Sequence, residues 1–132
     1  MSEQEPEPSQ ELLELSAKLF DLARSGDTDT LSAYIDAGVP QNLTNDSGDT
    51  LLMLAAYHGH ADTVRALLTR GADPNRLNDR GQSPVAGAVF KDEPDVVRAL
   101  LSGGADPEAG HPTAFDTASM FGNEDMLTML RG

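Results

Sequence analysis

The sequence predicts an all-α fold, a solenoid of stacked helix-turn-helix repeats joined by hairpin-like turns. The phrase Gly-Ala-Asp-Pro occurs at residues 71–74 and again at 104–107, a step of thirty-three residues. Between the copies, glycines, aliphatic pairs and small residues recur in the same phase. Self-similarity at this period is typical of supersecondary units that bury their apolar faces against one another rather than around one closed core.

Recurring residues define the register of the repeat. Gly26, Gly59, Asp92 and Gly122 form one column, and Gly38, Gly71 and Gly104 form another. The aliphatic pairs in phase are Tyr34-Ile35, Leu67-Leu68, Leu100-Leu101 and Met129-Leu130, and the small or apolar column is Leu22, Ala55, Ala88 and Ala118. The last step is 30 residues long, which places a three-residue deletion in the loop near residues 108–111.

The first unit is predicted to begin with a long helix behind a disordered acidic tail, residues 1–10. The tail is rich in glutamate and proline and has too little apolar surface to offset the entropy of ordering. A helix is expected to start near Ser9, which can cap it. Leu12, Leu15, Leu19 and Leu22 recur on one face of that helix. The folded domain is predicted to cover residues 11–132, with repeats near 17–45, 46–78, 79–110 and 111–131.

The second unit is predicted to contain two short helices. Thr50 can cap a helix through residues 52–56, which Gly59 ends because glycine tolerates positive φ. The second helix runs from about residue 62 to 69, with Val64, Leu67 and Leu68 as its buried stripe. A polar loop then leads to the next turn.

The third unit is predicted to be the weakest part of the stack, and the fourth has clear helix signals. Gly87 lies inside a helix at a cost of about 1 kcal/mol against alanine, and Asp92 replaces the helix-ending glycine. Pro94 stands where a missing N–H costs nothing. In the fourth unit, Thr113 and Asp116 have the spacing of a capping box.

Part of this sequence resembles the ankyrin repeat. The residues that carry the resemblance are Gly48 to His60, Val64, Leu67-Leu68 and Gly71 to Asn75. A third copy, residues 81–107, matches less closely, and the resemblance covers about residues 17–131. It implies an L-shaped stack of helix pairs that binds other proteins through the concave surface of its turns and first helices, without catalysis or cofactor.

The sequence departs from the ankyrin pattern at several positions, including Gly87 and Asp92 of the third unit. The Thr-Pro-Leu-His signature occurs only as fragments at residues 50–53, 83–86 and 113–116, and its histidine is missing each time. The first unit lacks the signature and resembles an N-terminal capping repeat. In the family that histidine braces the threonine of the signature, and no repeat of this sequence has it.

The composition limits the classes of partner. Nine Lys+Arg against 22 Asp+Glu give a formal net charge of −13. Such a surface repels nucleic acid and anionic membranes and steers a basic protein toward itself; the alternative is that the acidity only maintains solubility. The chain has no cysteine, no secretory signal and no stretch of about 20 apolar residues. We therefore expect a cytoplasmic monomer, and the excess of arginine over lysine favours a bacterial source.

The sequence carries no arrangement typical of catalysis, metal binding or a cofactor. His58 and His60 are two residues apart, so on a helix they would point to different sides. The third histidine, His111, is distant in sequence, and there are no thiolate ligands. No phosphate-binding loop, dinucleotide fingerprint or nucleophile elbow occurs. We predict no enzymatic activity, no metal and no cofactor.

The candidate partner-binding residues lie on the turns and at the ends of the first helices. They are Asp46, Asp49, Tyr57, His58, Asp79, Arg80, Gln82, Phe90, Lys91, Met120 and Phe121. Tyr57, Phe90 and Met120 are predicted to form a ligand-facing stripe, since aromatic and methionine side chains are enriched at interfaces. The alternative is that they are ordinary isolated surface residues, and for Phe121 burial against the last helix is the alternative.

These observations favour a non-catalytic protein-protein interaction module. One alternative is an acidic inhibitor or immunity-type protein for a basic enzyme, which the net charge suggests. Another is a fragment of a larger ankyrin scaffold, although Arg131 and Gly132 form a plausible natural helix ending. An enzyme or a metal protein is the least favoured class.

Overall fold

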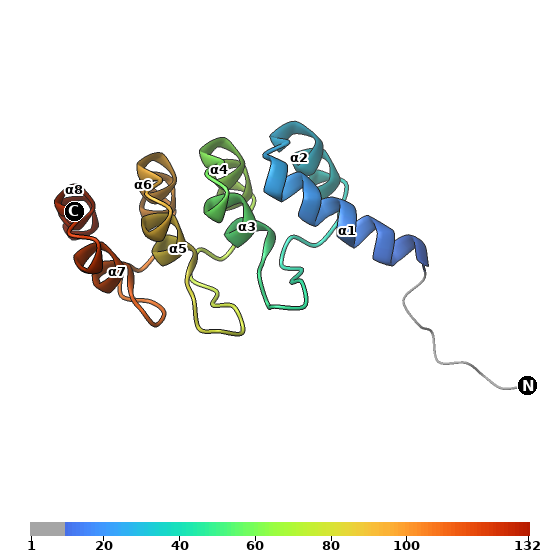
Figure 1. Cartoon of the computed structure of the whole chain (residues 1–132). Coiled ribbons are helices and arrows are strands. Elements are labelled where there is room, and N and C mark those ends of the chain that lie inside the picture. The colour runs from blue at the N-terminus through green and yellow to red at the C-terminus, as the bar shows by residue number, and fades with distance from the viewer. Residues whose placement is uncertain (1–9) are drawn as a thin grey trace, which may run out of the picture.

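A computed structural model describes residues 10–132, which form helices joined by turns (Figure 1). The predicted acidic tail up to residue 9 and the Ser9 cap lie outside the described residues. Within residues 10–132 the helices are α1 (Gln10–Ser25), α2 (Thr28–Asp36), α3 (Leu51–Tyr57), α4 (Ala61–Thr69), α5 (Pro84–Phe90), α6 (Pro94–Ser102), α7 (Ala114–Met120) and α8 (Glu124–Arg131). The predicted all-α solenoid is confirmed.

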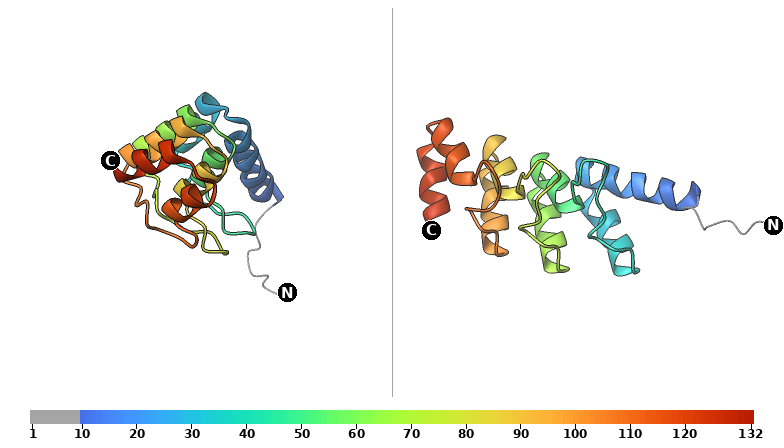
Figure 2. Two further views of the ribbon diagram at one scale, coloured as in Figure 1. Left: turned by 60° about the vertical axis from the view of Figure 1, so that its left-hand side comes forward. Right: turned by 90° about the horizontal axis from the view of Figure 1, so that it is seen from below.

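The helices form antiparallel hairpins that stand side by side in a row (Figures 1 and 2). The first helices, α1, α3, α5 and α7, pack in one layer, and the second helices, α2, α4, α6 and α8, pack in another. The loops that connect successive hairpins all project to the same side of the stack, below the helices in Figure 1. Each hairpin therefore contacts its neighbours along the chain, as a solenoid requires.

The core is a strip that runs along the stack between the two layers. Its fully buried side chains include Leu31, Leu67 and Leu100, one from each of three successive hairpins. Ala88 and Ala118 are also fully buried in the first-helix layer, where small side chains let neighbouring helices approach closely. No hairpin encloses a core of its own, so burial depends on stacking.

Side-chain oxygens cap three of the first helices, at Thr50 and Thr113 as predicted and also at Ser83, for which no cap was predicted. Thr50 Oγ1 accepts the backbone N–H of Met53 at 3.1 Å, and Ser83 Oγ accepts that of Ala86 at the same distance. Thr113 and Asp116 form the predicted capping box at the start of α7. These local hydrogen bonds satisfy N–H groups that a helix leaves unpaired at its N-terminus, and they fix where α3, α5 and α7 begin.

The turn after each first helix needs a left-handed residue. Gly59, which follows α3, has φ 82°, and Gly122, which follows α7, has φ 64°. Asp92 follows α5 with φ 57°, the one non-glycine residue with positive φ among those described. Aspartate tolerates this region better than most side chains. The third unit thus keeps the backbone geometry of its neighbours while adding a carboxylate.

The first helix differs from the expectation at its N-terminal end. Leu19 is fully buried and Leu15 and Leu22 are partly buried, but Leu12 is 53% exposed and does not belong to the buried stripe. The reason is length: α1 has 16 residues and α3 has 7, so the first turns of α1 extend past the helix on which it packs (Figure 1). Among residues 10–132, no helix has the length and apolar character needed to cross a bilayer.

Candidate functional site

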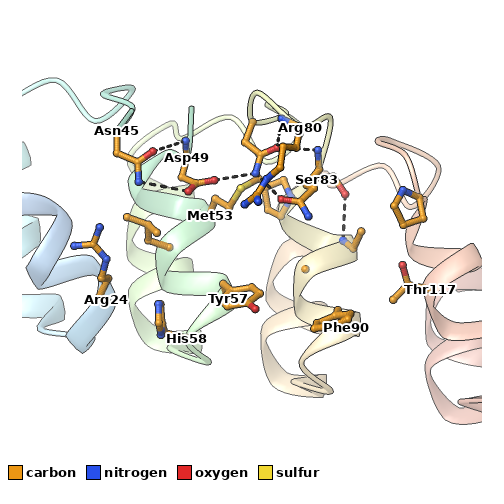
Figure 3. Close-up of a pocket in the computed structure, with 17 residues that line it drawn as sticks. Arg24, Asn45, Asp49, Met53, Tyr57, His58, Arg80, Ser83, Phe90 and Thr117 are labelled. Atoms are coloured by element: carbon orange, nitrogen blue, oxygen red, sulfur yellow. Dashed lines mark hydrogen bonds between the residues drawn. The ribbon is translucent and has the colours of Figure 1, made fainter. Parts of the chain in front are cut away.

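A groove lies on the first-helix layer between α3 and α5 and encloses about 530 Å³ (Figure 3). We call it the α3–α5 groove. Met53 and Leu54 of α3 and Ala86 and Gly87 of α5 line it, together with side chains of the adjoining turns. Arg24 of α1 reaches it from one end of the stack and Thr117 of α7 from the other (Figure 3).

Two exposed aromatic residues line the groove. Tyr57 ends α3 and Phe90 ends α5, thirty-three residues apart at equivalent positions of successive hairpins. Tyr57 is 40% exposed and Phe90 is 55% exposed, and both lie at the same level of the groove in Figure 3. Large, rigid aromatic side chains of this kind bury much area on binding at low entropic cost.

Gly87 keeps the space beside Tyr57 open. A Cβ atom on Gly87 would lie 3.7 Å from Cδ1 of Tyr57, at ordinary van der Waals distance and with no clash. A side chain would therefore fit sterically at this position, so packing of the folded chain does not require glycine. The glycine lowers the stability of the helix but leaves the groove deeper beside Tyr57. The predicted weakness of the third unit is therefore explained by the space that it provides for a ligand.

Gly87→Ala is expected to raise the free energy of unfolding by about 1 kcal/mol, because alanine is the better helix former and its methyl group meets no obstacle. The same methyl group should weaken binding of any ligand in the groove. Urea denaturation and partner titration measure the two effects. Thr69→Ala, on the exposed side of α4, is the control that improves helix propensity away from the groove. A loss of stability in Gly87→Ala would contradict this interpretation.

The rim of the groove is built by two turns with the same internal hydrogen bonds. Asn45 Oδ1 accepts the backbone N–H groups of Ser47 and Asp49 at 2.9 and 3.0 Å. Asn78, thirty-three residues later, accepts those of Arg80 and Gln82, both at 3.0 Å. Each asparagine therefore replaces a backbone acceptor and closes its own turn.

Asn78 also joins the two turns to each other. Its Nδ2 donates to Asp49 Oδ1 at 2.9 Å, across the boundary between hairpins, and to Gln82 Oε1 at 2.7 Å (Figure 3). The backbone N–H of Asp79 donates to the carbonyl of Ser47 at 3.0 Å. Asn78 is buried, at 6% exposure. This network positions the rim side chains relative to one another.

Asp49, a candidate partner-binding residue, lines the groove, but its carboxylate is engaged by neighbouring side chains of the same chain. Asp49 is half-buried, and its carboxylate accepts from Asn78 Nδ2 and, at 3.4 Å, from Asn45 Nδ2. The cause is tertiary: the next turn brings the Asn78 amide against this carboxylate. The charge of Asp49 therefore holds the turns together. Asp46 and Asp79 are exposed on their turns, outside the lining of the groove.

The groove itself is not acidic, although the chain is. Its lining carries Arg24, Arg80 and Asp49 as charged side chains, and Arg24 also pairs with Asp21 at 2.9 Å. His58 lines it too: partial burial, then the neighbouring charges of His60, Arg24 and Lys91, hold the pKa of its imidazole below the ordinary value. His58 is therefore neutral near pH 7, and the net charge of −13 is carried mostly elsewhere.

The other predicted residues divide between the groove and its surroundings. Gln82 lines the groove, and the Lys91 ammonium lies 4.9 Å from the centre of the Tyr57 ring. Phe121 is 56% exposed, so it is not buried against the last helix, and its ring centre lies 5.6 Å from that of Phe90. Met120 is exposed but does not line the groove.

The sequence reasoning missed Arg24, Asn45 and Asn78. The signal for all three was present in the repeat period. Arg24, Tyr57 and Phe90 are spaced by thirty-three residues, as are Asn45 and Asn78. Extending the register to these columns would have found them.

His60 has a structural position. Its Nε2 lies 2.7 Å from the backbone carbonyl oxygen of Arg24. The ring therefore links the turn after α3 to the C-terminal end of α1. Within residues 10–132, no group of three or more histidine, aspartate or glutamate side chains lies close enough to hold a metal ion.

Comparison with known proteins gives two matches. Residues 19–111 match the sequence pattern of a family described as ankyrin repeats, in three copies. A stretch of 53 residues is 49% identical to a Pseudomonas aeruginosa protein named as an ankyrin repeat protein. The stretch covers 40% of this chain and 31% of that protein, so the chain matches less than a third of the relative's length.

Proposed function

Because the chain belongs to the ankyrin-repeat family, we propose that it is a non-catalytic module that binds a partner protein in the α3–α5 groove. Ankyrin repeats are protein-interaction modules in general. The observation that carries the choice of surface is the exposed pair Tyr57 and Phe90, which flank a groove left open at Gly87.

The chemistry of the groove supports a binding role. Its aromatic walls and apolar floor offer area for burial, and its rim offers polar groups in fixed positions, the composition typical of an interface core and its surroundings. The carboxylate of Asp49 is engaged by two asparagine amides. That engagement favours a structural role for Asp49 over a role as a general acid or base.

Capture of partners from the native host tests this function. Tyr57→Ala/Phe90→Ala should reduce capture of the specific partner, and its affinity once purified, by about tenfold or more, because exposed aromatic residues are frequent binding hot spots. Mass spectrometry identifies the partner, and circular dichroism confirms that the variant is folded.

Leu13→Ala/Leu77→Ala is the matched control, because Leu13 is 54% and Leu77 is 39% exposed, close to the values of Phe90 and Tyr57, and both lie outside the groove. The control should bind as the wild type does. Equal binding by all three folded proteins would rule out this groove.

A second candidate function is inhibition of a basic enzyme. It is favoured by the net charge of −13 and by a row of exposed carboxylates in the first turns of the second helices. These are Asp29, Asp62, Asp95 and Asp125. For such a partner the association rate should fall steeply with salt while the dissociation rate changes little; a salt-independent association rate, measured by stopped flow, would favour the apolar groove alone.

A further inference from the structure

A second depression lies next to the groove, between the ends of α5 and α7. Phe90 and Phe121 line it together with the carboxylates of Asp92, Glu124 and Asp125. We call it the α5–α7 cleft. Phe90 lines both the groove and the cleft, so the two adjoin at this residue.

The aromatic side of the cleft is available to a ligand. Phe90 and Phe121 meet edge to face, with ring centres 5.6 Å apart and planes at 65°. Despite that contact, the two residues remain 55% and 56% exposed. Two adjoining aromatic rings left open in this way form an apolar surface that further burial would stabilise.

The charged side chains that line the cleft are all negative. Its lining contains three carboxylates and no lysine, arginine or histidine. The nearest cation in sequence, Lys91, extends toward the Tyr57 ring, which lines the groove. Asp92 Oδ1 accepts a hydrogen bond from Asn123 Nδ2 at 3.2 Å. This bond holds the Asp92 carboxylate beside the turn that follows α7.

The Asp92 carboxylate is particular to this cleft. In the other hairpins the equivalent positions are Gly26, Gly59 and Gly122, which have no side chain. The α3–α5 groove, by contrast, is lined by two arginines and one aspartate. The surface over the first helices therefore changes from weakly basic to acidic as it passes Phe90.

We propose that the α5–α7 cleft binds a lysine or arginine side chain of the protein partner. This inference rests on the proposed function and specifies the chemistry of the partner. The aliphatic stem of the side chain packs on Phe90 and Phe121, and its charged end pairs with Asp92, Glu124 and Asp125. An adjoining apolar residue of the partner occupies the α3–α5 groove. Phosphate groups of nucleic acid or membrane are repelled by the same carboxylates.

The test uses a library of random twelve-residue peptides displayed on phage and selected on the full chain. Selected peptides should be enriched in lysine or arginine next to an apolar residue. The best peptide is then synthesised with a fluorescent label, and its affinity is measured by fluorescence anisotropy. Its basic residue is also replaced by an uncharged analogue, norleucine for lysine or citrulline for arginine.

The cleft variant is Asp92→Asn/Glu124→Gln/Asp125→Asn, which removes the charges and keeps the side-chain shapes. Asparagine also tolerates the positive φ of Asp92 and can still accept from Asn123. The matched control is Glu11→Gln/Asp29→Asn/Glu108→Gln, which changes the net charge equally at exposed positions away from the cleft. Melting curves confirm that both variants fold.

The cleft variant should bind the labelled peptide about tenfold or more weakly, and the control nearly as tightly as the wild type. The uncharged peptide should lose affinity for the wild type but not for the cleft variant. Equal losses in both variants, or selected peptides without basic residues that still depend on Tyr57 and Phe90, would overturn this inference alone. A library that yields no peptide dependent on Tyr57 and Phe90 would contradict the proposed function as well.

Discussion

Leu100→Ala is expected to lower the free energy of unfolding by about 2–5 kcal/mol. Leu100 is fully buried in α6, whose neighbours in the second-helix layer are α4 and α8. Removing its side chain loses apolar burial and leaves a cavity that close-packed neighbours fill only in part. In a solenoid the damage spreads, because the last hairpin depends on α5 and α6 for its buried face.

Urea denaturation followed by circular dichroism measures this loss. Leu101→Ala is the matched control, because Leu101 is the next residue of the same helix and is only partly buried. The control should lose clearly less stability. If the two variants were equally stable, or if Leu100→Ala cost less than about 1 kcal/mol, the assignment of Leu100 to the stacked core would be wrong.

Asn78→Ala is expected to lower the free energy of unfolding by about 2–4 kcal/mol. Each hydrogen bond contributes a net stabilisation of about 1 kcal/mol, and a bond to a charged partner contributes more. The Asn78 side chain accepts two backbone N–H groups within its turn and donates to Asp49 and Gln82. Its removal leaves these partners without the buried amide and separates the two turns that form the rim.

Asn45→Ala provides the comparison for Asn78→Ala. Asn45 makes the same contacts within its own turn but is only half-buried, and its bond to Asp49 is longer, at 3.4 Å. Thermal melts should show the smaller loss for Asn45→Ala. Partner affinity should also fall in Asn78→Ala, because Asp49 and Arg80 lose their fixed positions. Equal melting temperatures for the two variants would show that the bond between the turns adds no stability.

Local signals in this sequence predicted local structure reliably. Thr50 and the pair Thr113 and Asp116 were expected to begin helices, and both do. In such a cap the side chain and the N–H group that it accepts are only three residues apart, so a short stretch of sequence is enough to predict the bond. Pro94 likewise occupies the first turn of α6, as predicted. The extent of the buried face of α1 was not predicted correctly, because Leu12 has helical spacing but lies beyond the stacked layer.

The candidate site was predicted in part. Tyr57 and Phe90 were found because the repeat register places them at equivalent exposed helix ends, and they do line one groove. Asp49 also lines the groove, but its hydrogen bond with Asn78 was not predicted, because Asn78 is twenty-nine residues away and belongs to the next turn. Whether Phe121 was buried or exposed also depended on how α7 and α8 pack, which the spacing of its neighbours does not fix.

The sequence by itself determined the period of the chain, its helices and its repeat family, because a 33-residue pattern of glycines, small residues and aliphatic pairs allows each hairpin to bury its apolar face only against the next. The tertiary structure alone decided how charge is distributed over that stack. It joined Asn78 to Asp49 across two turns, left Gly87 beside an open Tyr57, and brought Asp92 together with Phe121. These contacts depend on the angle and spacing between neighbouring hairpins, which arise from side-chain packing and are not encoded in the repeat period.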